Sequence, residues 1–469
     1  MDHPHLPRTA RRFLVATLAL LPCLAAAEPV PDASFGDNGT VALTLPGVDD
    51  VIRARVVVLP DRRIVVVRLE IGNAGTVGAP VPPTASFARL LPDGRLDPAF
   101  GTGGIATFAL GTELVGSAYP QQLAARADGS VLLLMSERTL GPAPSVTRLV
   151  LFGVAPDGRA DPAFNGGQPL RMQPTNHSRF DLFEANGSPL VVARSESWCC
   201  SGAATPLAAW RFRADGTPDP SFGSGGRLEL SLPAMSVHDV MSVPGGGFQT
   251  LTETQAGDGV RRFWRRYRAN GSLDTGFGVN GEEDIVPVGS AGFTQVLPLG
   301  DGTWLATDPA PCAQRILDAQ GRTLGATTGD CPVELQYTAN SVEAHAWGTR
   351  VLVRGEQRSS FLPPPSDGAY LWSIDRDGRV DTDFAQPQVV RWRPASPPWP
   401  TNSDVAVDGA DRFVLASMQV GSDVVYVQRF VDARRGTGDA QPVPALGLPA
   451  LLLLAAGAAA LARRRCAPR

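Results

Sequence analysis

The sequence contains no lysine, so arginine supplies all 42 of its basic residues. We attribute this bias to a GC-rich bacterial genome and draw nothing from it about partners. Charge is also sparse: charged residues make up 19% of the chain, and the formal net charge is −4. Several of the arginines lie in the first twelve or last seven residues, which leaves an even more acidic body. Such a body disfavours nucleic-acid binding, which requires a clustered basic surface.

Long uninterrupted helical segments are absent from the body of the chain. The 469 residues include 50 glycines and 42 prolines, spread too evenly for a disordered tail, while 43% of the residues are hydrophobic. Glycine and proline interrupt helices and mark turns. The composition therefore predicts an all-β protein of many short strands, arranged as one large repetitive domain rather than two or three unrelated ones.

Recognisable catalytic motifs are missing as well. The sequence has no HExxH, no GxSxG and no phosphate-binding glycine loop. His177, His238 and His345 fall at different offsets from the turns that recur along the chain, so repeat symmetry does not bring them together. Solvent or loop histidines are the simpler interpretation, since catalytic histidines come with a partner.

Both ends carry segments typical of export. Residues 1–27 have arginines, an apolar run from Phe13 and small residues up to Ala27, which predicts a signal peptide cut after Ala27. Near the other end, residues 445–462 are apolar and precede Arg463, Arg464 and Arg465. This predicts a transmembrane helix with a cytoplasmic basic tail, residues 463–469, although a buried core helix is the alternative.

The C-terminal plan of short motif, apolar span and arginine cluster resembles the PEP-CTERM and IPTL-CTERM sorting signals of exported bacterial proteins. Val443-Pro444-Ala445-Leu446 stands where the IPTL group has its signature, and it begins within a linker over 437–444 that carries this sorting-like motif. The resemblance implies a sorting protease as a partner, and release or surface attachment of the body if the tail is processed. Without processing, the segment 445–462 would anchor the protein in the membrane.

Cysteine is scarce, with six in the whole chain and four in the exported body. Disulfides persist in an exported protein, and four cysteines allow three pairings. We favour a disulfide between Cys312 and Cys331, which lie within one repeat. Cys199 and Cys200 would then form a vicinal bond or a free pair. Metal binding is a minor alternative because no CxxC spacing occurs.

A turn of the form Asp-x-x-Phe recurs along the body. The spacings between successive phenylalanines are 65, 64, 58 and 55 residues, followed by a gap of 107. A gap near twice the period predicts one degenerate copy, at residues 315–331, where the predicted disulfide would take over the role of the turn. The recurring phenylalanines, interpreted as structural pins between repeats, are Phe35, Phe100, Phe164, Phe222, Phe277 and Phe384.

Seven hairpin turns alternate with these Asp-x-x-Phe turns, each between apolar runs, as in LAARADGSVLLL. Glycine supplies the positive φ that a tight reversal requires. One period then holds four short antiparallel strands, which is the size of a propeller blade. We therefore predict a seven-bladed β-propeller over residues 28–436. Its ring is expected to close by pairing of the N-terminal strand, within 35–45, with the C-terminal strand, within 424–436, which removes two open sheet edges.

The unit DGRLDPAFGTGG, residues 93–104, together with hairpins such as ADGSVLLL, resembles the bacterial delta-60 repeat family. The likeness covers nearly all of residues 32–436 and is weakest in the sixth and last copies. It implies an exported, surface-associated bacterial protein and no common activity.

Two sets of residues are candidate ligand contacts. Trp392 and Trp399 lie in a proline-rich insertion without repeat equivalents, where exposed aromatics would stack on a glycan or peptide. Asp375, Asp377 and Asp381 offer oxygen ligands suited to calcium, although aspartate at such turns commonly bonds its own backbone. Ordinary long loops and backbone-capping turns are the structural alternatives. No other cofactor is predicted.

These features favour a non-enzymatic, cell-envelope β-propeller that serves as a binding or structural module for a glycan or protein. The main alternative is an exported hydrolase or lyase whose site lies at the central channel of the propeller.

Overall fold

The computed structural model describes residues 29–46, 51–70, 84–110, 116–139, 147–173, 175, 177–185, 187–195, 205–232, 235–256, 259–284, 295–298, 303–307, 314–318, 322–327, 341–347, 350–357, 368–375, 381, 384, 390–392, 402–409, 411–418 and 423–432. The predicted signal peptide, the segment 437–469 and the four body cysteines lie outside these residues. Within them, no helix combines the length and hydrophobicity of a membrane span.

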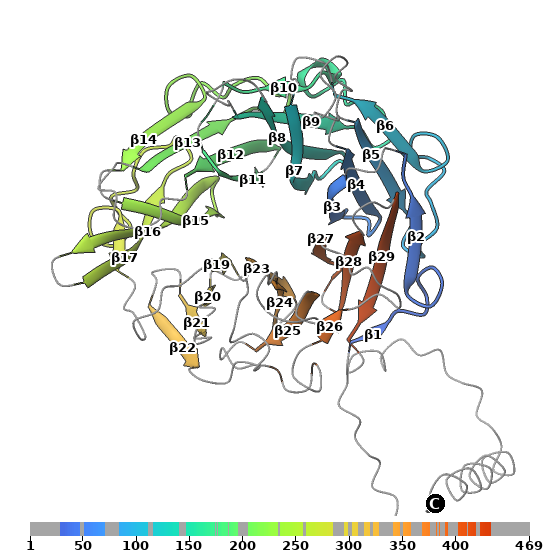
Figure 1. The fold of residues 1–469 in the computed structure, drawn as a ribbon. Helices are drawn as coiled ribbons and strands as arrows, with labels where there is room; N and C mark the ends of the chain where they lie inside the picture. The colour runs from blue at the N-terminus through green and yellow to red at the C-terminus, as the bar shows by residue number, and fades with distance from the viewer. Residues whose placement is uncertain are drawn as a thin grey trace, which may run out of the picture.

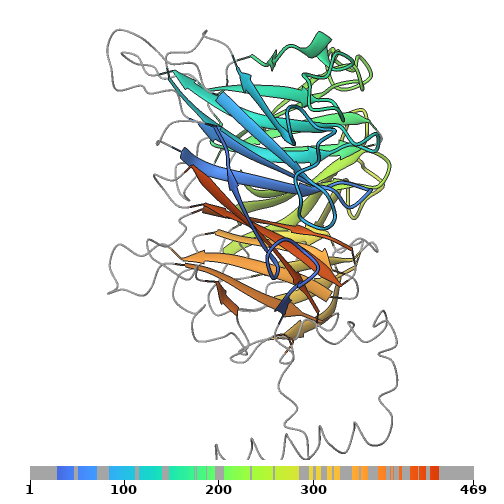
Figure 2. The same cartoon turned by 90° about the vertical axis from the view of Figure 1, so that its right-hand side faces the viewer.

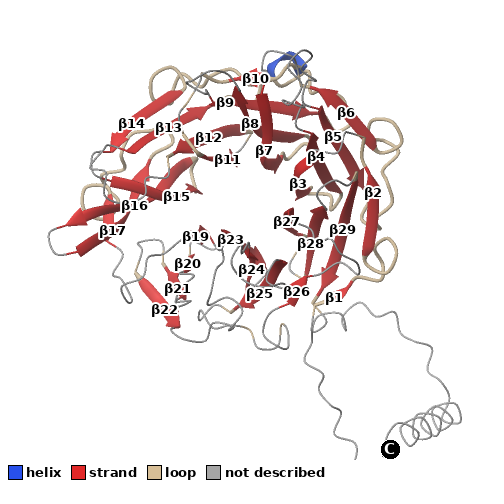
Figure 3. Cartoon of the chain, in the orientation of Figure 1, coloured by secondary structure: helices blue, strands red, loops and turns tan. Residues whose placement is uncertain are grey.

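The described chain is almost entirely β-strand, with one short 3-10 turn, η1 (Asn165–Gly167) (Figure 3). Consecutive strands form antiparallel sheets of four. The first three are β3 (Val51–Val58), β4 (Ile64–Glu70), β5 (Thr84–Leu90) and β6 (Ile105–Ala109); β7 (Gly116–Ala125), β8 (Val131–Thr139), β9 (Thr147–Val154) and β10 (Leu170–Arg171); and β11 (Arg179–Ala185), β12 (Ser188–Arg194), β13 (Thr205–Arg211) and β14 (Arg227–Leu232).

Three more four-stranded sheets follow along the chain. They comprise β15 (Met235–Val243), β16 (Gly247–Ala256), β17 (Gly259–Tyr267) and β18 (Glu282–Asp284); β19 (Gln295–Pro298), β20 (Trp304–Thr307), β21 (Gln314–Leu317) and β22 (Thr323–Thr327); and β23 (Ser341–Trp347), β24 (Arg350–Gln357), β25 (Gly368–Ile374) and β26 (Val390–Trp392). The all-β expectation is thus confirmed.

The last sheet joins the two ends of the chain. It contains β27 (Asn402–Val407), β28 (Arg412–Met418) and β29 (Val424–Val431), and β29 also pairs with β1 (Val30–Pro31) and β2 (Thr40–Thr44). The register of β2 on β29 runs from Thr40 opposite Gln428 to Thr44 opposite Val424. The N-terminal strand therefore pairs with the C-terminal strand, as the sequence predicted, and Figure 2 shows the blue and red segments side by side. We call this five-stranded sheet the closing sheet.

The sheets stand around a common centre in a propeller-like arrangement (Figure 1). The first strand of each sheet lies innermost and contacts the first strand of the next. The sequence of contacts is β27 with β3, β3 with β7, β7 with β11, β11 with β15, β15 with β19, β19 with β23, and β23 with β27.

The Asp-x-x-Phe turns fold in the same way in successive sheets. In the turn at Asp97, the carboxylate accepts the Ala99 N–H at 3.0 Å, and the Phe100 N–H donates to the Asp97 carbonyl at 3.1 Å. The next residue, Gly101, has a φ of 55° and donates its N–H to the Asp157 carbonyl at 2.8 Å. Asp157 belongs to the loop that follows β9 in the next sheet, so the turn of one sheet is bonded to the neighbouring sheet.

This inter-sheet hydrogen bond recurs along the chain. In each case the donor is the N–H of the residue that follows the phenylalanine. The acceptor is a carbonyl in the loop after the third strand of the next sheet, one residue before the glycine of that loop's turn. The distances are 2.8 to 2.9 Å for Gly36 to Asp93, Asn165 to Asp215 and Gly223 to Asn270. A side chain on that turn glycine would collide with the donor: a Cβ at Gly158 would lie 2.3 Å from the Gly101 nitrogen. The glycine is therefore required by the close approach of two sheets.

The phenylalanines of these turns are buried between neighbouring sheets. Phe100, for example, is 1% exposed and packs in a cluster with Val65 of β4 and Leu133 of β8. The other five phenylalanines are also buried, each in a cluster between two neighbouring sheets. Phe35 lies between the closing sheet and β3–β6, Phe164 between β7–β10 and β11–β14, and Phe222 between β11–β14 and β15–β18. Phe277 lies between β15–β18 and β19–β22, and Phe384 between β23–β26 and the closing sheet. This position is the one expected of a pin between sheets.

The degenerate sixth copy differs from the others in the length of one connection. β21 ends at Leu317 and β22 begins at Thr323, so only residues 318–322 separate the third strand from the fourth. The corresponding connection between β5 and β6 comprises residues 91–104. The chain thus returns directly as β22, without a loop that could carry an Asp-x-x-Phe turn.

We expect Phe100→Ala to lower the free energy of unfolding by about 3–5 kcal/mol, because it removes a buried ring and leaves a cavity between two sheets. Urea-induced unfolding followed by tryptophan fluorescence measures the change. Val279→Ala, at an apolar side chain that is 76% exposed, is the control and should change stability by no more than about 0.5 kcal/mol. A loss below about 1 kcal/mol for Phe100→Ala would show that the ring is not a pin.

Candidate functional site

The predicted aromatic site is only partly within the described residues. Trp392 is the last residue of β26, where it pairs with Ala369 of β25. Trp399 lies outside the described residues. Trp392 is therefore placed on an outer strand, at the end that leads into the proline-rich insertion.

The predicted calcium ligands do not all fall in the described part either. Asp375 follows β25, and Asp377 is outside the described residues. The carboxylate of Asp381 accepts a hydrogen bond from Arg350 Nη1 at 3.0 Å. Among the described residues, no group of three or more His, Cys, Asp or Glu side chains is placed to hold a metal ion. Asp381 thus takes part in an ion pair.

A buried arginine faces the aspartate of the recurring turn. Arg89 of β5 donates from Nε to Asp97 Oδ2 at 2.8 Å, and its guanidinium lies 4.8 Å from the centre of the Phe100 ring. The same guanidinium donates from Nη1 to the carbonyl of Pro156, which belongs to the next sheet. We call this combination of turn aspartate, arginine, phenylalanine ring and neighbouring carbonyl the arginine latch.

The arginine latch recurs in other sheets. Arg211 and Arg266 lie over Phe222 and Phe277, at 5.0 and 3.9 Å from the ring centres. Burial lowers the pKa of both guanidinium groups, and the opposing charges of Asp219 and Asp274 raise it. Arg211 also donates to the Ala269 carbonyl of the next sheet. A guanidinium can bind a carboxylate, a carbonyl and a ring face together because it is planar and carries five donors.

Two sheets lack the arginine in this position and keep only an arginine of the central hairpin, of the kind that Arg63 supplies to Asp97 at 3.2 Å beside Arg89. The carbonyl of Arg89 accepts the N–H of the turn aspartate Asp97. In the two other sheets the carbonyls of Gly153 and Ser373 accept the N–H of Asp161 and Asp381 in the same way, so these residues occupy the position of Arg89. Asp161 instead faces Arg126 Nη1 at 3.6 Å, and Asp381 binds Arg350.

In these two sheets the aspartate is bound from the central hairpin. Arg126 follows β7 and also donates to the Ala214 carbonyl of the next sheet at 3.1 Å. Arg350 begins β24, and its guanidinium lies 4.2 Å from the centre of the Trp347 ring. The aspartate is thus matched by a guanidinium even where the repeat has changed.

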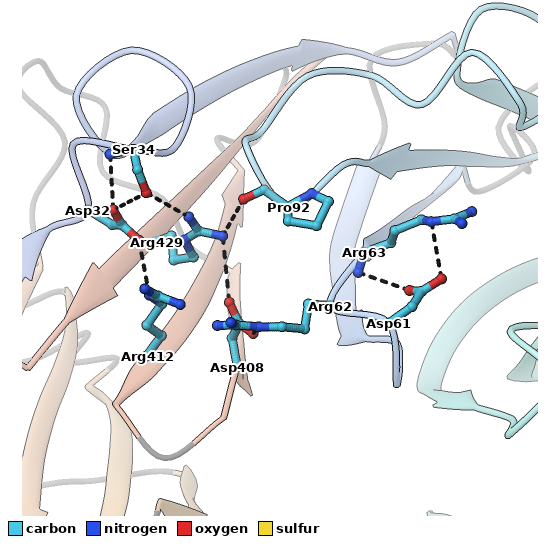
Figure 4. Close-up of polar contacts among 9 residues, drawn as sticks. All are labelled: Asp32, Ser34, Asp61, Arg62, Arg63, Pro92, Asp408, Arg412 and Arg429. Atoms are coloured by element: carbon cyan, nitrogen blue, oxygen red, sulfur yellow. Dashed lines mark hydrogen bonds and ion pairs between the residues drawn. The ribbon is translucent and has the colours of Figure 1, made fainter. Parts of the chain in front are cut away.

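The closing sheet carries the most extended version of the latch (Figure 4). Arg429 of β29 donates to Asp32 at 2.9 Å, lies 4.6 Å from the centre of Phe35, and also donates to the Pro92 carbonyl. Arg412 adds a second contact to Asp32 at 3.3 Å. The two ends of the chain are therefore joined by charge as well as by strand pairing.

Asp408 extends this network to the first complete sheet. Its side chain is 1% exposed and faces Arg62 at 3.0 Å and Arg429 at 3.6 Å (Figure 4). Burial alone would raise the pKa of Asp32, but hydrogen bonds from Ser34 and the charges of Arg429 and Arg412 hold it below its ordinary value. The carboxylate of Asp32 therefore stays ionised in the folded protein.

A second set of polar contacts links the innermost strands. Asp404 of β27 accepts the N–H of Val56 on β3 at 2.7 Å, and its other oxygen lies 3.7 Å from Arg55 Nη1. Arg55 in turn donates from Nε to the Gln121 carbonyl of β7 at 2.8 Å. Since the inner edge of β3 has no strand partner, a side chain from the preceding sheet satisfies its backbone.

The same principle operates further around the ring. Gln122 of β7 accepts the N–H of Leu182 on β11. Arg194 of β12 lies 3.3 Å from Asp181 and 3.5 Å from Asp239, and it donates to the carbonyl of His238 on β15. We call the contacts from Asp404 to Asp239 the inner belt.

The inner belt places one histidine beside a carboxylate. His238 sits in a β-bulge of β15, between the paired residues Val237 and Asp239, and its Nε2 lies 3.2 Å from Glu253 Oε2. The His238 side chain is 34% exposed. Bulges re-aim side chains and are frequent near active sites, and a histidine within reach of a carboxylate is an arrangement used in general acid–base catalysis. This pair is the candidate for acid–base chemistry that sequence reasoning did not find.

A carboxylate with buried oxygens lies on β11, the innermost strand of the β11–β14 sheet. Both oxygens of Glu184, on β11, are shielded from solvent, and the described residues offer them no hydrogen bond of ordinary geometry. Burial raises the pKa of Glu184, and the charge of Arg126 only partly offsets this. Glu184 therefore weakens the fold when it is ionised.

The latch had a sequence signal that the pattern of turns left unused. In three copies an arginine stands eight residues before the turn aspartate, in Arg89 and Asp97, Arg211 and Asp219, and Arg266 and Asp274. The inner belt and the pair of His238 with Glu253 have no comparable spacing, because their partners come from separate strands.

Comparison with known proteins adds little beyond the fold. No protein-family model matches the sequence, and no curated protein does. Among solved structures, the chain is similar to a protein of unknown function from Dyadobacter fermentans, with 10% identity, a TM-score of 0.43, and coverage of 87% of this chain and 100% of that one.

Two enzymes are similar at the same low level. Prolyl oligopeptidase B from Galerina marginata has 9% identity and a TM-score of 0.38, with 82% of this chain and 48% of that chain covered. The Hadza microbial sialidase Hz136 has 10% identity and a TM-score of 0.38, with 76% and 74% covered. The match thus spans about half the length of the oligopeptidase.

We expect Arg89→Ala to lower the free energy of unfolding by about 1.5–3 kcal/mol, since it removes a charged hydrogen bond to Asp97 and a bond between sheets and leaves Asp97 with Arg63, at 3.2 Å, as its remaining guanidinium partner. Chemical unfolding measures the change. Arg95→Ala is the matched control in the same loop, because the Arg95 side chain is 77% exposed in its pair with Asp93, and no measurable change is expected. Equal losses in the two variants would contradict a special role for the latch.

We expect Glu184→Gln to raise the melting temperature at pH 7. The folded protein favours the protonated carboxyl group because burial raises its pKa, so Glu184 costs stability increasingly as the pH rises above the unfolded pKa, and the cost is complete above the folded pKa. The cost disappears as the pH falls below the unfolded value, and the gain from glutamine should shrink in parallel. Thermal unfolding between pH 4 and pH 8 measures both effects, and a lower melting temperature for the variant at pH 7 would contradict the assignment.

Proposed function

We propose that this chain is an exported, cell-envelope-associated β-propeller of seven four-stranded blades that acts as a non-enzymatic binding or structural module. The six four-stranded sheets and the closing sheet would be its blades. The contacts from each innermost strand to the next, and the pairing of β2 with β29, support a closed ring.

The observation that supports the non-enzymatic proposal is that the polar groups of the recurring turns are bound to other groups of the protein. The N–H of Gly101 is bonded to Asp157, that of Gly104 to Phe100, and the carboxylate of Asp97 to Arg89. A phosphate-binding loop needs such N–H groups directed at a ligand. In this protein they hold sheets together, which favours a scaffold whose ligand contacts lie in the non-repeating insertions.

Ligand contacts are proposed for the insertion that contains Trp392 and Trp399, with a glycan or protein of the envelope as the partner. Calcium bound by Asp375, Asp377 and Asp381 is the proposed cofactor, and a disulfide between Cys312 and Cys331 is the proposed crosslink. The resemblance to delta-60 repeats and to a sorting signal supports the envelope address. Anchoring through residues 445–462, or processing by a sorting protease, would follow from it.

One observation favours the alternative, an exported hydrolase or lyase with its site at the centre of the ring. His238 and Glu253 form a partly exposed acid–base pair on β15 and β16. General acid–base catalysis needs such a pair within hydrogen-bond reach of the substrate.

A thermal-shift screen of the mature protein against glycans, peptidoglycan fragments and calcium tests the proposal. A ligand at one hundred times its Kd should stabilise the fold by about 2.7 kcal/mol. We expect the shift to be lost in Trp392→Ala with Trp399→Ala and kept in His238→Gln. Turnover of a ligand by the wild-type protein, abolished by His238→Gln, would overturn the non-enzymatic proposal in favour of the alternative.

Mass spectrometry of the protein from its own cells tests the proposed address. The mature chain should begin at Glu28 and, if the tail is sorted, end before Ala445. A chain that begins at Met1 would contradict export through the predicted signal peptide.

A further inference from the structure

We infer that the ring has a built-in seam between the β19–β22 sheet and the β23–β26 sheet, where it opens more readily than at any latched junction. This inference concerns the conformation of the ring and does not depend on which ligand the protein binds.

The junctions between neighbouring sheets are not equivalent. Six of them enclose a phenylalanine of the recurring turn, namely Phe35, Phe100, Phe164, Phe222, Phe277 or Phe384. In each case the phenylalanine is contributed by the loop between the third and fourth strands of a sheet, or by the equivalent segment before β2. The β19–β22 sheet should contribute such a loop to the junction with β23–β26.

The β19–β22 sheet has no room for this loop. The Asp318 N–H donates to the Arg322 carbonyl at 2.9 Å, closing the turn as Arg268 and Ser272 do in the preceding sheet at 2.8 Å. After that turn β22 starts at once, with Thr323, and pairs with β21. In the preceding sheet residues 273–281 intervene between the same turn and β18.

The residues of the arginine latch are replaced in the same sheet. The turn that begins at Asp318 corresponds to the turn that begins at Arg268, so Ile316 occupies the position of Arg266. Ile316 is apolar and is buried in the sheet, with 2% of its surface exposed. Eight residues later Leu324 stands in the place of the turn aspartate, in β22, and is 62% exposed. The side chains that elsewhere bind the next sheet by charge and by ring packing are therefore both absent from these positions.

The innermost strands still meet at this junction, since β19 contacts β23. Local opening in a folded protein occurs first where few buried apolar and polar contacts must be broken. Among the described residues, this junction lacks a pin and a buried ion pair, and the contact of β19 with β23 holds it. The proposed disulfide between Cys312 and Cys331 joins two positions of the same repeat, so it would fasten the β19–β22 sheet to itself and not to the next sheet. The ring can therefore part at the seam while the closing sheet, with its strand pairing and its Asp32 and Asp408 network, stays shut. Opening there would give a ligand a lateral way to the centre of the ring.

Hydrogen–deuterium exchange of the mature protein, read by mass spectrometry, tests the seam. Under native conditions the peptides that contain β19 and β23 should exchange at least about tenfold faster than those that contain β3 and β7, the innermost strands of a latched junction. Exchange at equal rates, or faster exchange at β3 and β7, would overturn the inference.

A graft distinguishes a weak junction from a weak sheet. Replacing residues 318–322 by the segment 268–281, together with Ile316→Arg, supplies the β19–β22 sheet with a pin and a latch. Exchange at β23 should then slow by about tenfold, while β3 and β7 keep their rates. The matched control is the same graft with alanine in the place of its phenylalanine and Ile316 retained, which has the same loop length and should leave β23 fast.

The single substitution Phe222→Ala, without the graft, provides a second test if the grafted protein does not fold. Removing the pin between the β11–β14 and β15–β18 sheets should create a new fast-exchanging junction at β11 and β15. If exchange there is unchanged, the pins do not control opening and the inference fails.

Discussion

The buried pair of arginine and aspartate is the interaction on which the arrangement of the sheets depends. One repeat unit cannot bury its hydrophobic faces alone, so each sheet must be packed against its neighbours. Apolar packing between sheets has no direction, whereas a guanidinium bound to Asp97, to the Phe100 ring and to the Pro156 carbonyl fixes the relative position of two sheets. The same three contacts set the spacing between one turn and the next.

The exceptions show that the requirement is physical rather than a relic of duplication. A buried aspartate without a partner would cost several kcal/mol, so a repeat without the latch arginine depends on the arginine of the central hairpin. Where Gly153 has replaced the arginine, a Cβ would lie 3.0 Å from the Cβ of Phe164, and Arg126 reaches the aspartate from the central hairpin instead. Where Ser373 has replaced it, Arg350 does so. The β19–β22 sheet, in contrast, has lost the loop and the arginine position together, which leaves no aspartate to satisfy.

Much of this fold was predictable from the sequence because it repeats. The all-β class, the strands around each Asp-Gly turn and the pairing of the ends follow from a period of about sixty residues and from the half-unit at each end. The inner belt was not predictable, since Asp404 and Val56 lie far apart in sequence and meet only when the ring is assembled. The pair of His238 with Glu253 depends on a one-residue bulge in β15, and bulges leave little trace in a single sequence. The sequence predicted that the sixth copy lacks the Asp-x-x-Phe turn. The bounds of β21 and β22 were needed to show that the whole loop between these strands is short, and that one junction between sheets is affected.

The distribution of polar groups bears on where function resides. A residue that repeats in every sheet cannot select one ligand, because the same chemistry would be presented at every junction, and in this ring those residues are used for cohesion. Selectivity must come from positions at which the repeats differ. Within the described residues, the bulge at His238 and the end of β26 at Trp392 are two such positions, and the junction without a latch is a third. If the junction between the β19–β22 and β23–β26 sheets opens as we propose, the latched junctions would keep the shape of the ring while one segment moves, and a ligand could enter without loss of the ring.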